Sequence, residues 1–87
     1  MIAVYVLESL QDKTWYTGMC MDISNRLKEH NVGKNRFTKG HRPWKIIYVE
    51  QHDDWKSARI REKYLKFSAG KKWLLKHLQE SEGSLPA

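Results

Sequence analysis

Two tyrosines, Tyr5 and Tyr16, are the residues whose types and spacing most suggest chemistry. Each lies in an apolar run, and the mostly polar stretch 8–14 between the runs has the composition of a hairpin connection. Pairing the runs about the Leu10–Gln11 midpoint places Tyr5 directly opposite Tyr16, with Cβ atoms roughly 4.5–5.5 Å apart. Two adjacent phenols suit a dry core poorly, because each hydroxyl needs a hydrogen-bonding partner. The pair therefore favours a wet catalytic face, although packing of Tyr16 against Trp15 and the sheet explains it nearly as well.

Glu62 is a further residue of interest, because its surroundings are strongly basic. It is the only carboxylate between Trp55 and Gln79, a stretch that also holds eight Lys and Arg residues. Such a carboxylate is either a site residue or a salt-bridge partner for a neighbouring cation, namely Arg59, Arg61 or Lys66.

The cations of the chain are concentrated in two segments. A formal net charge of +6 and a pI near 9.6 suggest a polyanionic partner. Residues 1–29 are nearly balanced in charge, whereas residues 30–49 contain no acid and residues 55–79 contain only Glu62. For most of these lysines, a position on an ordinary solvent-exposed helix face is a sufficient explanation. The cations that we expect to bind nucleic acid are Lys34, Arg36, Lys39, Arg42, Lys63 and Lys66.

A small α+β fold must position these side chains. Residues 2–7 are almost continuously apolar and rich in branched side chains, which is typical of a central strand covered on both faces. The other strands are predicted over residues 14–19 and 44–50, and the helices over 23–31, 55–67 and 68–78, with a basic loop over 33–43. The order is therefore ββαβαα, a three-stranded antiparallel sheet with helices packed on it.

Side chains that cap helices mark where the three helices begin. Asp22 suits the N-cap of the first helix, which the sequence Asn31-Val32-Gly33 would end. Asp53 or Asp54 suits the second helix, and Ser68 suits the third. The residues expected to face the core are Ile23 and Leu27 in the first helix, Trp55, Ala58 and Leu65 in the second, and Trp73, Leu74 and Leu78 in the third.

Length and composition restrict the classes of function. The chain of 87 residues makes one small domain, and its four Trp and four Tyr help the core because large rings bury much area. Cys20 is the single cysteine, which excludes an intrachain disulfide and a cysteine-based metal cluster, and favours a reducing, cytoplasmic setting. No apolar run approaches the roughly 20 residues of a membrane span, so no membrane partner is expected. Neither a P-loop nor a glycine-rich dinucleotide-binding turn occurs, which argues against nucleotide-cofactor enzymes.

An ordered set of short motifs resembles the GIY-YIG endonuclease superfamily. The motifs are Ala3-Val4-Tyr5, Tyr16-Thr17-Gly18, the run Asn25-Arg26-Leu27-Lys28-Glu29-His30-Asn31, the run Phe37-Thr38-Lys39-Gly40 before Arg42-Pro43, and Arg61-Glu62-Lys63-Tyr64-Leu65-Lys66. The chain is most similar to small, stand-alone bacterial members, which resemble the amino-terminal domain of an excinuclease. The resemblance implies a GIY-YIG nuclease-like domain over residues 1–80, followed by a flexible tail over 81–87.

The resemblance also implies roles in phosphodiester hydrolysis, a reaction that builds negative charge on phosphoryl oxygens and needs an activated water. Glu62 matches the glutamate that holds a single divalent metal, and Mg²⁺ (or Mn²⁺) suits one hard oxygen ligand and a mostly hydrated sphere. Arg26 matches the arginine that clamps the scissile phosphate, and His30 lies four residues later on the same helix face, so it is expected to reach the same phosphate. Tyr5 matches the tyrosine proposed as general base, its pKa lowered by Arg26 and the metal, while Tyr16 supports or orients the water.

Two departures from the family pattern keep a second hypothesis open. Ala3 replaces the first glycine of the motif, and no asparagine follows Glu62, although many nucleases of the superfamily have one there. The leading hypothesis is a metal-dependent DNA endonuclease, a hydrolase acting on branched, damaged or single-stranded DNA in repair or recombination, alone or within a larger repair complex. The alternatives are a nucleic-acid-binding module of the same fold with weak or lost hydrolysis, and a protein whose basic surface binds an acidic protein.

Overall fold

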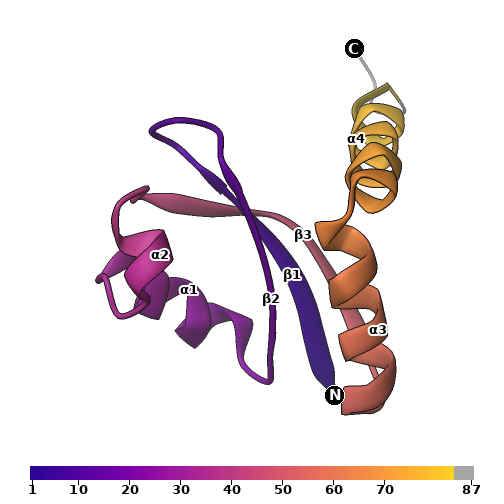
Figure 1. The fold of residues 1–87 in the computed structure, drawn as a ribbon, viewed down its shortest axis with the longest axis horizontal. Helices are drawn as coiled ribbons and strands as arrows, with labels where there is room; N and C mark the ends of the chain where they lie inside the picture. The colour runs from indigo at the N-terminus through magenta and orange to yellow at the C-terminus, as the bar shows by residue number, and fades with distance from the viewer. Residues whose placement is uncertain (84–87) are drawn as a thin grey trace.

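The structure, a computed structural model, describes residues 1–83 of the chain. Its elements in chain order are β1 (Ile2–Ser9), β2 (Trp15–Cys20), α1 (Ile23–Asn31), α2 (Arg36–Lys39), β3 (Trp44–His52), α3 (Trp55–Lys66) and α4 (Ser68–Gly83) (Figure 1). This is the α+β fold that the sequence predicts, with one short helix, α2, inside the segment predicted as a basic loop. Of the tail predicted over 81–87, residues 81–83 continue α4 and residues 84–87 lie outside the described residues.

The prediction that the first strand is central is confirmed. The sheet is antiparallel with the order β2-β1-β3, and β1 is covered on both faces. Its even-numbered residues from Ile2 to Val6 pack with Ala58, Leu65 and Leu74 of α3 and α4. Its odd-numbered residues from Ala3 to Leu7 pack on the opposite face, beside α1. Figure 1 shows the same division, with α1 and α2 on one side of the sheet and α3 and α4 on the other.

The register predicted for the β1–β2 hairpin is wrong by two residues. Tyr5 lies opposite Gly18, and Tyr16 lies opposite Leu7. The turn causes this shift, because the Ser9 hydroxyl accepts hydrogen bonds from the backbone N–H groups of Gln11 and Asp12 and so fixes where the chain reverses. A shift of two residues keeps every side chain on its face, because side chains alternate with a period of two. Tyr5 and Tyr16 therefore still share a face.

The caps predicted for the first two helices are confirmed. The Asp22 carboxylate accepts from the Asn25 N–H at 3.1 Å, and the Asp54 carboxylate accepts from the Ser57 N–H at 2.7 Å. Past the end of α1, Gly33 has a φ of +87°, a conformation that favours glycine. This turn directs the chain from α1 into α2.

The inner face predicted for α3 is only partly right. Ala58 and Leu65 are buried, but Trp55 is 50% exposed. Trp55 is the first residue of α3, ahead of Ala58, where the contact of this helix with the core begins. Among the described residues, no helix combines the length and the apolar composition that a bilayer span requires.

Candidate active site

Tyr5 and Tyr16 lie together on the face of the sheet that α1 and α2 cover. Their ring centroids are 6.4 Å apart, and Tyr5 is buried whereas Tyr16 is partly exposed. Gly18 makes this arrangement possible, because a Cβ at that position would lie 2.6 Å from the Tyr5 hydroxyl oxygen. The glycine of the second motif therefore makes room for the tyrosine of the first. Trp15 lies on the opposite face, so the packing of Tyr16 against Trp15 considered above does not occur.

His30 links these rings to α2. Its Nε2 lies 3.0 Å from the Tyr5 hydroxyl, and its Nδ1 lies 2.8 Å from the Thr38 hydroxyl. The Thr38 hydroxyl donates to the Asn35 carbonyl, so its oxygen is left to accept from a protonated Nδ1. Nε2 is then the acceptor for the Tyr5 hydroxyl. Burial, followed by the nearby Arg26 charge, lowers the pKa of His30, which favours the neutral ring.

This arrangement differs from the prediction for His30 in one respect. Both ring nitrogens already contact protein groups and the residue is 2% exposed, so in this structure it does not offer a free donor to a phosphate. Thr38 is absent from the residues predicted for the site. It is eight residues from His30, and only the unpredicted helix α2 brings its hydroxyl within reach. Its position in the run from Phe37 to Gly40 is the signal that could have found it.

The pKa of the Tyr5 phenol is raised well above its ordinary value of about 10. Burial is the largest cause and the nearby Tyr16 is the second, while Arg26 lowers the pKa by less than these raise it. The prediction is that Arg26 and the metal together lower this pKa; the lowering by Arg26 alone is outweighed. Tyr5 is a neutral hydrogen-bond donor to His30 near neutral pH.

Arg26 and His30 line one cavity of about 170 Å³ between α1 and the start of the α2 segment. The other lining residues are Glu29, Lys34 and Asn35. Arg26 is exposed, and its Nε lies 3.2 Å from a carboxylate oxygen of Glu29, one turn further along the helix. The cavity is therefore lined by two cations and one carboxylate beside the buried His30. An anion that entered it would compete with Glu29 for Arg26.

Glu62 lies on α3, which packs on the other face of the sheet from α1. Its charge raises the pKa of Tyr5 and the charge of Arg26 lowers it, so each of the two acts on the Tyr5 phenol, Glu62 less than Arg26. The Glu62 side chain is 15% exposed, and Lys66 Nζ lies 3.5 Å from its carboxylate. The salt bridge to Lys66 considered above is thus formed, whereas Arg61 pairs with a different carboxylate.

The described side chains offer a divalent metal a single carboxylate here. No three His, Cys, Asp or Glu side chains in the described part of the chain gather closely enough to hold an ion. Mg²⁺ commonly binds one or two carboxylates and keeps several waters, completed by phosphate oxygens of a substrate. The donor set around Glu62 fits that mode and does not fit a structural zinc site.

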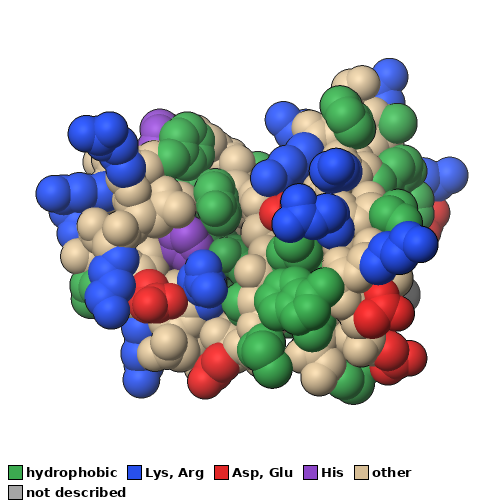
Figure 2. Space-filling model, turned by 60° about the horizontal axis from the view of Figure 1, so that its bottom comes forward, with side chains coloured by type: hydrophobic (Ala, Val, Ile, Leu, Met, Phe, Trp, Pro, Cys, Tyr) green, Lys and Arg blue, Asp and Glu red, His purple; other side chains and the backbone are tan. Residues whose placement is uncertain are grey.

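The basic side chains predicted to bind nucleic acid are exposed and lie on both flanks of this region. Figure 2 shows Lys and Arg side chains over α1 and α2 on one flank and over α3 and α4 on the other. Some of them make weak contacts: Lys34 Nζ lies 3.7 Å from Glu29, and Arg42 Nε donates to the Lys39 carbonyl at 3.0 Å. The predicted residues are Lys34, Arg36, Lys39 and Arg42 around α2, and Lys63 and Lys66 on α3.

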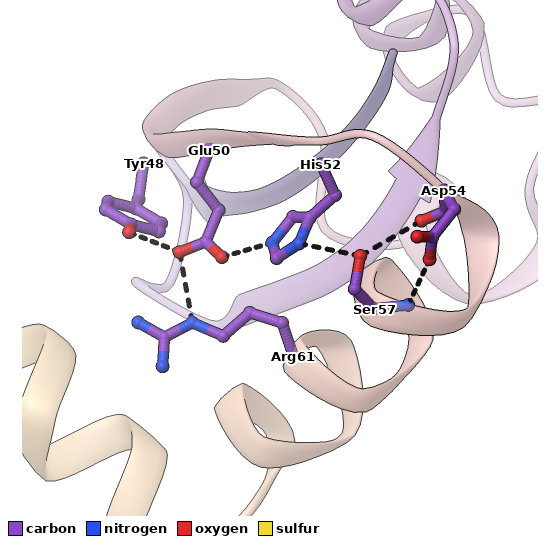
Figure 3. A network of polar contacts seen from close by, with 6 residues as sticks. All are labelled: Tyr48, Glu50, His52, Asp54, Ser57 and Arg61. Atoms are coloured by element: carbon purple, nitrogen blue, oxygen red, sulfur yellow. Dashed lines mark hydrogen bonds and ion pairs between the residues drawn. The ribbon is translucent and has the colours of Figure 1, made fainter.

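A second polar network, absent from the predictions, joins β3 to α3 (Figure 3). The Glu50 carboxylate accepts from the Tyr48 hydroxyl and from Arg61 Nε, the latter at 3.0 Å. His52 lies between Glu50 and the Ser57 hydroxyl, with its Nδ1 3.3 Å from the latter. Burial raises the pKa of Glu50, but the hydrogen bonds from its neighbours outweigh burial and hold the pKa below its ordinary value.

This network anchors α3 on the sheet. The Arg61 guanidinium lies 4.3 Å from the centre of the Trp73 ring, so it connects β3, α3 and α4 at once. Arg61 precedes Glu62 directly, and fixing Arg61 fixes the direction in which Glu62 points. The alternation Tyr48-x-Glu50-x-His52 on one strand face is the sequence signal for this network.

Comparison with known proteins gives a consistent result. The family model described as GIY-YIG catalytic domain matches residues 1–76. A UPF0213 protein of Syntrophus aciditrophicus is 43% identical over 65 residues, which are 72% of this chain and 74% of that protein. The UPF0213 protein YazA of Bacillus subtilis is 35% identical over 78 residues, which are 88% of this chain and 78% of that protein. The NMR structure of a UPF0213 protein from Bacillus halodurans superposes with a TM-score of 0.53 at 33% identity, covering 90% of this chain and 85% of that one.

Proposed function

This chain belongs to the GIY-YIG catalytic-domain family, and from that premise we propose that it is a metal-dependent endonuclease that hydrolyses DNA phosphodiester bonds. The observation that carries the proposal is the cluster of Tyr5, Tyr16 and His30 beside the cavity that Arg26 lines. Family membership supports a nuclease-like domain, and the charge of Glu62, which acts on the Tyr5 phenol, supports including Glu62 in the proposed site.

We assign the binding of the scissile phosphate to Arg26. Its guanidinium is exposed at the cavity and stays charged at any working pH, so it can stabilise the charge that develops on the phosphoryl oxygens. Glu29 now occupies one side of this guanidinium and would be displaced by the phosphate. The remaining donors of Arg26 would then form a paired contact with two phosphate oxygens.

Tyr5 and His30 form the pair that moves the proton. Because Tyr5 donates to a neutral His30 Nε2, removal of the phenol proton has an acceptor 3.0 Å away. Tyr5 can therefore take a proton from the attacking water while its own proton passes to His30. Tyr16, partly exposed and 6.4 Å away between ring centroids, would orient that water.

Glu62 is the residue that would hold Mg²⁺ or Mn²⁺ at a single site. When bound, the metal would supply charge stabilisation at the phosphate oxygens. Lys66 is the present partner of Glu62, and it would move to a DNA phosphate as the metal binds.

The basic residues on both flanks would hold the DNA strands on either side of the cut. Branched, damaged or single-stranded DNA fits a domain that reads phosphates and has little surface for reading base sequence. We also propose that the protein acts in DNA repair or recombination, within a larger complex. The catalytic unit would be residues 1–80.

Incubation with plasmid and branched DNA in Mg²⁺, Mn²⁺ or EDTA tests this function. Wild type should cleave only with metal, and Glu62→Ala should lower cleavage on the order of 10²-fold, as loss of a transition-state charge stabiliser does. Glu80→Ala, a change of the same kind at an exposed position on α4, should cleave normally. Metal-dependent cleavage by Glu62→Ala at the wild-type rate would sink the assignment.

A binding module with weak or lost hydrolysis is the second candidate, and two observations favour it. The pKa of Tyr5 is raised and Glu62 is paired with Lys66, so neither group is prepared for its role without metal and substrate. This candidate predicts DNA binding that falls steeply with salt but little or no cleavage by wild type under any metal. The same incubation therefore separates it from the nuclease.

A further inference from the structure

Phe37 is an exposed aromatic side chain beside the candidate active site. It is 53% exposed although it is among the largest apolar residues of the chain. Its ring is stacked on Tyr16 with centroids 6.0 Å apart and an interplanar angle of 29°, and His41 lies 5.1 Å away. Tyr16 is in turn 4.9 Å from His30. Phe37 is thus the outermost of a series of contacting rings that leads from the buried Tyr5–His30 pair to the surface.

The helix that carries Phe37 is fixed in place. Four residues are too few for a helix to be stable by itself, so α2 depends on contacts outside it. The Asn35 side chain accepts from the Thr38 N–H at 3.1 Å, and the Thr38 hydroxyl contacts His30. Trp44 Nε1 donates to the Thr38 carbonyl at 2.8 Å. The residue next to Phe37 is therefore completely buried while Phe37 itself points outward from a rigid support.

The charge around this ring identifies the kind of molecule that would cover it. The exposed charged residues on either side of Phe37 in the sequence are cations, namely Lys34, Arg36, Lys39 and Arg42, and residues 30–49 contain no acid. Asp12, from the β1–β2 turn, is paired with His41. An acidic protein surface would pair with these cations but leave the ring uncovered, and an apolar protein surface would cover the ring but leave the cations unpaired. A nucleic acid does both, because its phosphates pair with cations while its bases stack on an aromatic ring. A base in a duplex is already stacked on its neighbours, so only an unpaired base has a free face for Phe37.

We propose that Phe37 stacks on an unpaired base next to the phosphate that is cut, and so selects single-stranded or locally unpaired DNA. This inference rests on the proposed nuclease function for the position of the cut, but its binding component does not require turnover. Arg26 holds the phosphate, and Phe37 fixes the adjoining nucleotide. Base stacking of this kind tolerates any base, because every base has a π-face.

Binding measurements in EDTA test the proposal without cleavage. The probes are a short single strand of thymidines and an abasic strand with the same number of phosphates. Wild type should prefer the thymidine strand by about tenfold, which corresponds to roughly 1.4 kcal/mol, within the range for one stacked base. Phe37→Ala should lose this preference and keep the salt dependence, because the phosphate contacts remain.

Three further variants make the test specific. Phe37→Trp should keep the preference, and Phe37→Leu, which still covers Tyr16, should lose most of it. Phe67→Ala removes the other phenylalanine, which is 67% exposed at the end of α3, across the sheet from α2 (Figure 1), and should behave as wild type. A thymidine preference that survives in Phe37→Ala, or that Phe67→Ala abolishes equally, would overturn the proposal.

Cleavage assays on the same variants separate this proposal from the nuclease. If wild type prefers the thymidine strand through Phe37 but cleaves nothing with Mg²⁺ or Mn²⁺, the stacking role stands and the nuclease proposal falls. If wild type cleaves and Phe37→Ala binds both strands as wild type does, the nuclease stands and the stacking role falls.

Discussion

The hydroxyl of Tyr5 and Nε2 of His30 lie 3.0 Å apart in a region almost closed to solvent. This contact joins the central strand of the sheet to α1, and through Thr38 it extends to α2. The candidate site is thus assembled around one buried histidine from β1, β2, α1 and α2, with Glu62 contributed by α3. Four predictions follow from how these groups are held.

Gly18→Ala should displace Tyr5 and lower cleavage without unfolding the protein. A Cβ at Gly18 would lie 2.6 Å from the Tyr5 oxygen and 3.2 Å from the Tyr16 ring, so the rings must move. We expect cleavage to fall by on the order of 10²-fold, as for misplacement of a reacting group by about 1 Å. The control is Gly40→Ala, because a Cβ at Gly40 has no atom within 4 Å. Equal cleavage by both variants would show that Tyr5 needs no fixed position.

Stability should fall as the pH drops below the ordinary pKa of histidine. The pKa of His30 is lowered in the folded state, so between that value and about 6.5 the unfolded chain binds more protons. The free energy of unfolding therefore decreases as pH falls through this window, and the contribution of His30 to it is fully present above the window. Thermal unfolding of wild type and His30→Gln, from about pH 7 to about pH 5, measures this. The decrease should be smaller in His30→Gln, and identical slopes would contradict the assignment.

Glu50→Gln should destabilise the protein by about 1.5–3 kcal/mol, the range for hydrogen bonds to a charged group. The change weakens the contacts with Tyr48, His52 and Arg61 at once. The pKa of Glu50 is held low in the folded state, so its contribution to the free energy of unfolding is present above about pH 4.3. This contribution is lost as pH falls through the pKa that Glu50 has in the folded state. Urea unfolding of Glu50→Gln and of the control Glu80→Gln measures this difference. Because Glu80 is exposed, the control should change the free energy of unfolding by less than about 0.5 kcal/mol.

Reversal of Lys39 and Arg42 to glutamate should weaken binding to any DNA sequence and flatten the salt dependence. Both side chains are exposed beside α2, where phosphates would lie next to the site. The control reverses Lys72 and Lys76 on α4, which changes the net charge by the same amount away from α2. Fluorescence anisotropy over a range of salt gives both slopes. An equally large effect of the control would mean that net charge alone drives binding.

Much of the fold could be predicted because local chemistry and tertiary structure agree. The apolar run from Ile2 to Leu7 has no polar face, so only a central strand could bury it. Asp22 and Asp54 cap helices by the short-range hydrogen bonds that their side chains favour. The hairpin register could not be obtained in this way. It depends on how Ser9 binds the turn and on Lys13 at a φ of 68°, whereas the apolar pattern is unchanged by a shift of two residues.

The motifs indicate which residues to consider for the site, but they do not indicate how these side chains contact one another. The motifs identify Tyr5 and His30, yet nothing in their spacing indicates that each is the hydrogen-bonding partner of the other. That contact depends on α2, a helix too short to be recognised from periodicity. The same helix carries Phe37, whose exposure becomes visible only when the chain is folded. The network around Glu50 likewise depends on α3 crossing β3 at one particular position.

The central position of β1 has a consequence for how the site responds to a substrate. Successive amides of β1 point alternately to β2 and to β3, and both faces of the strand are covered, so their exchange with solvent requires the sheet itself to open. The α2 segment is a single helical turn, and the first N–H groups of a helix have no partner within it, so they exchange without any opening of the sheet. Native-state hydrogen exchange should therefore be slowest at Tyr5 and much faster at Phe37. The pair proposed to transfer the proton would thus lie where the backbone opens least, and the residue proposed to stack on the substrate would lie where the backbone is accessible to solvent.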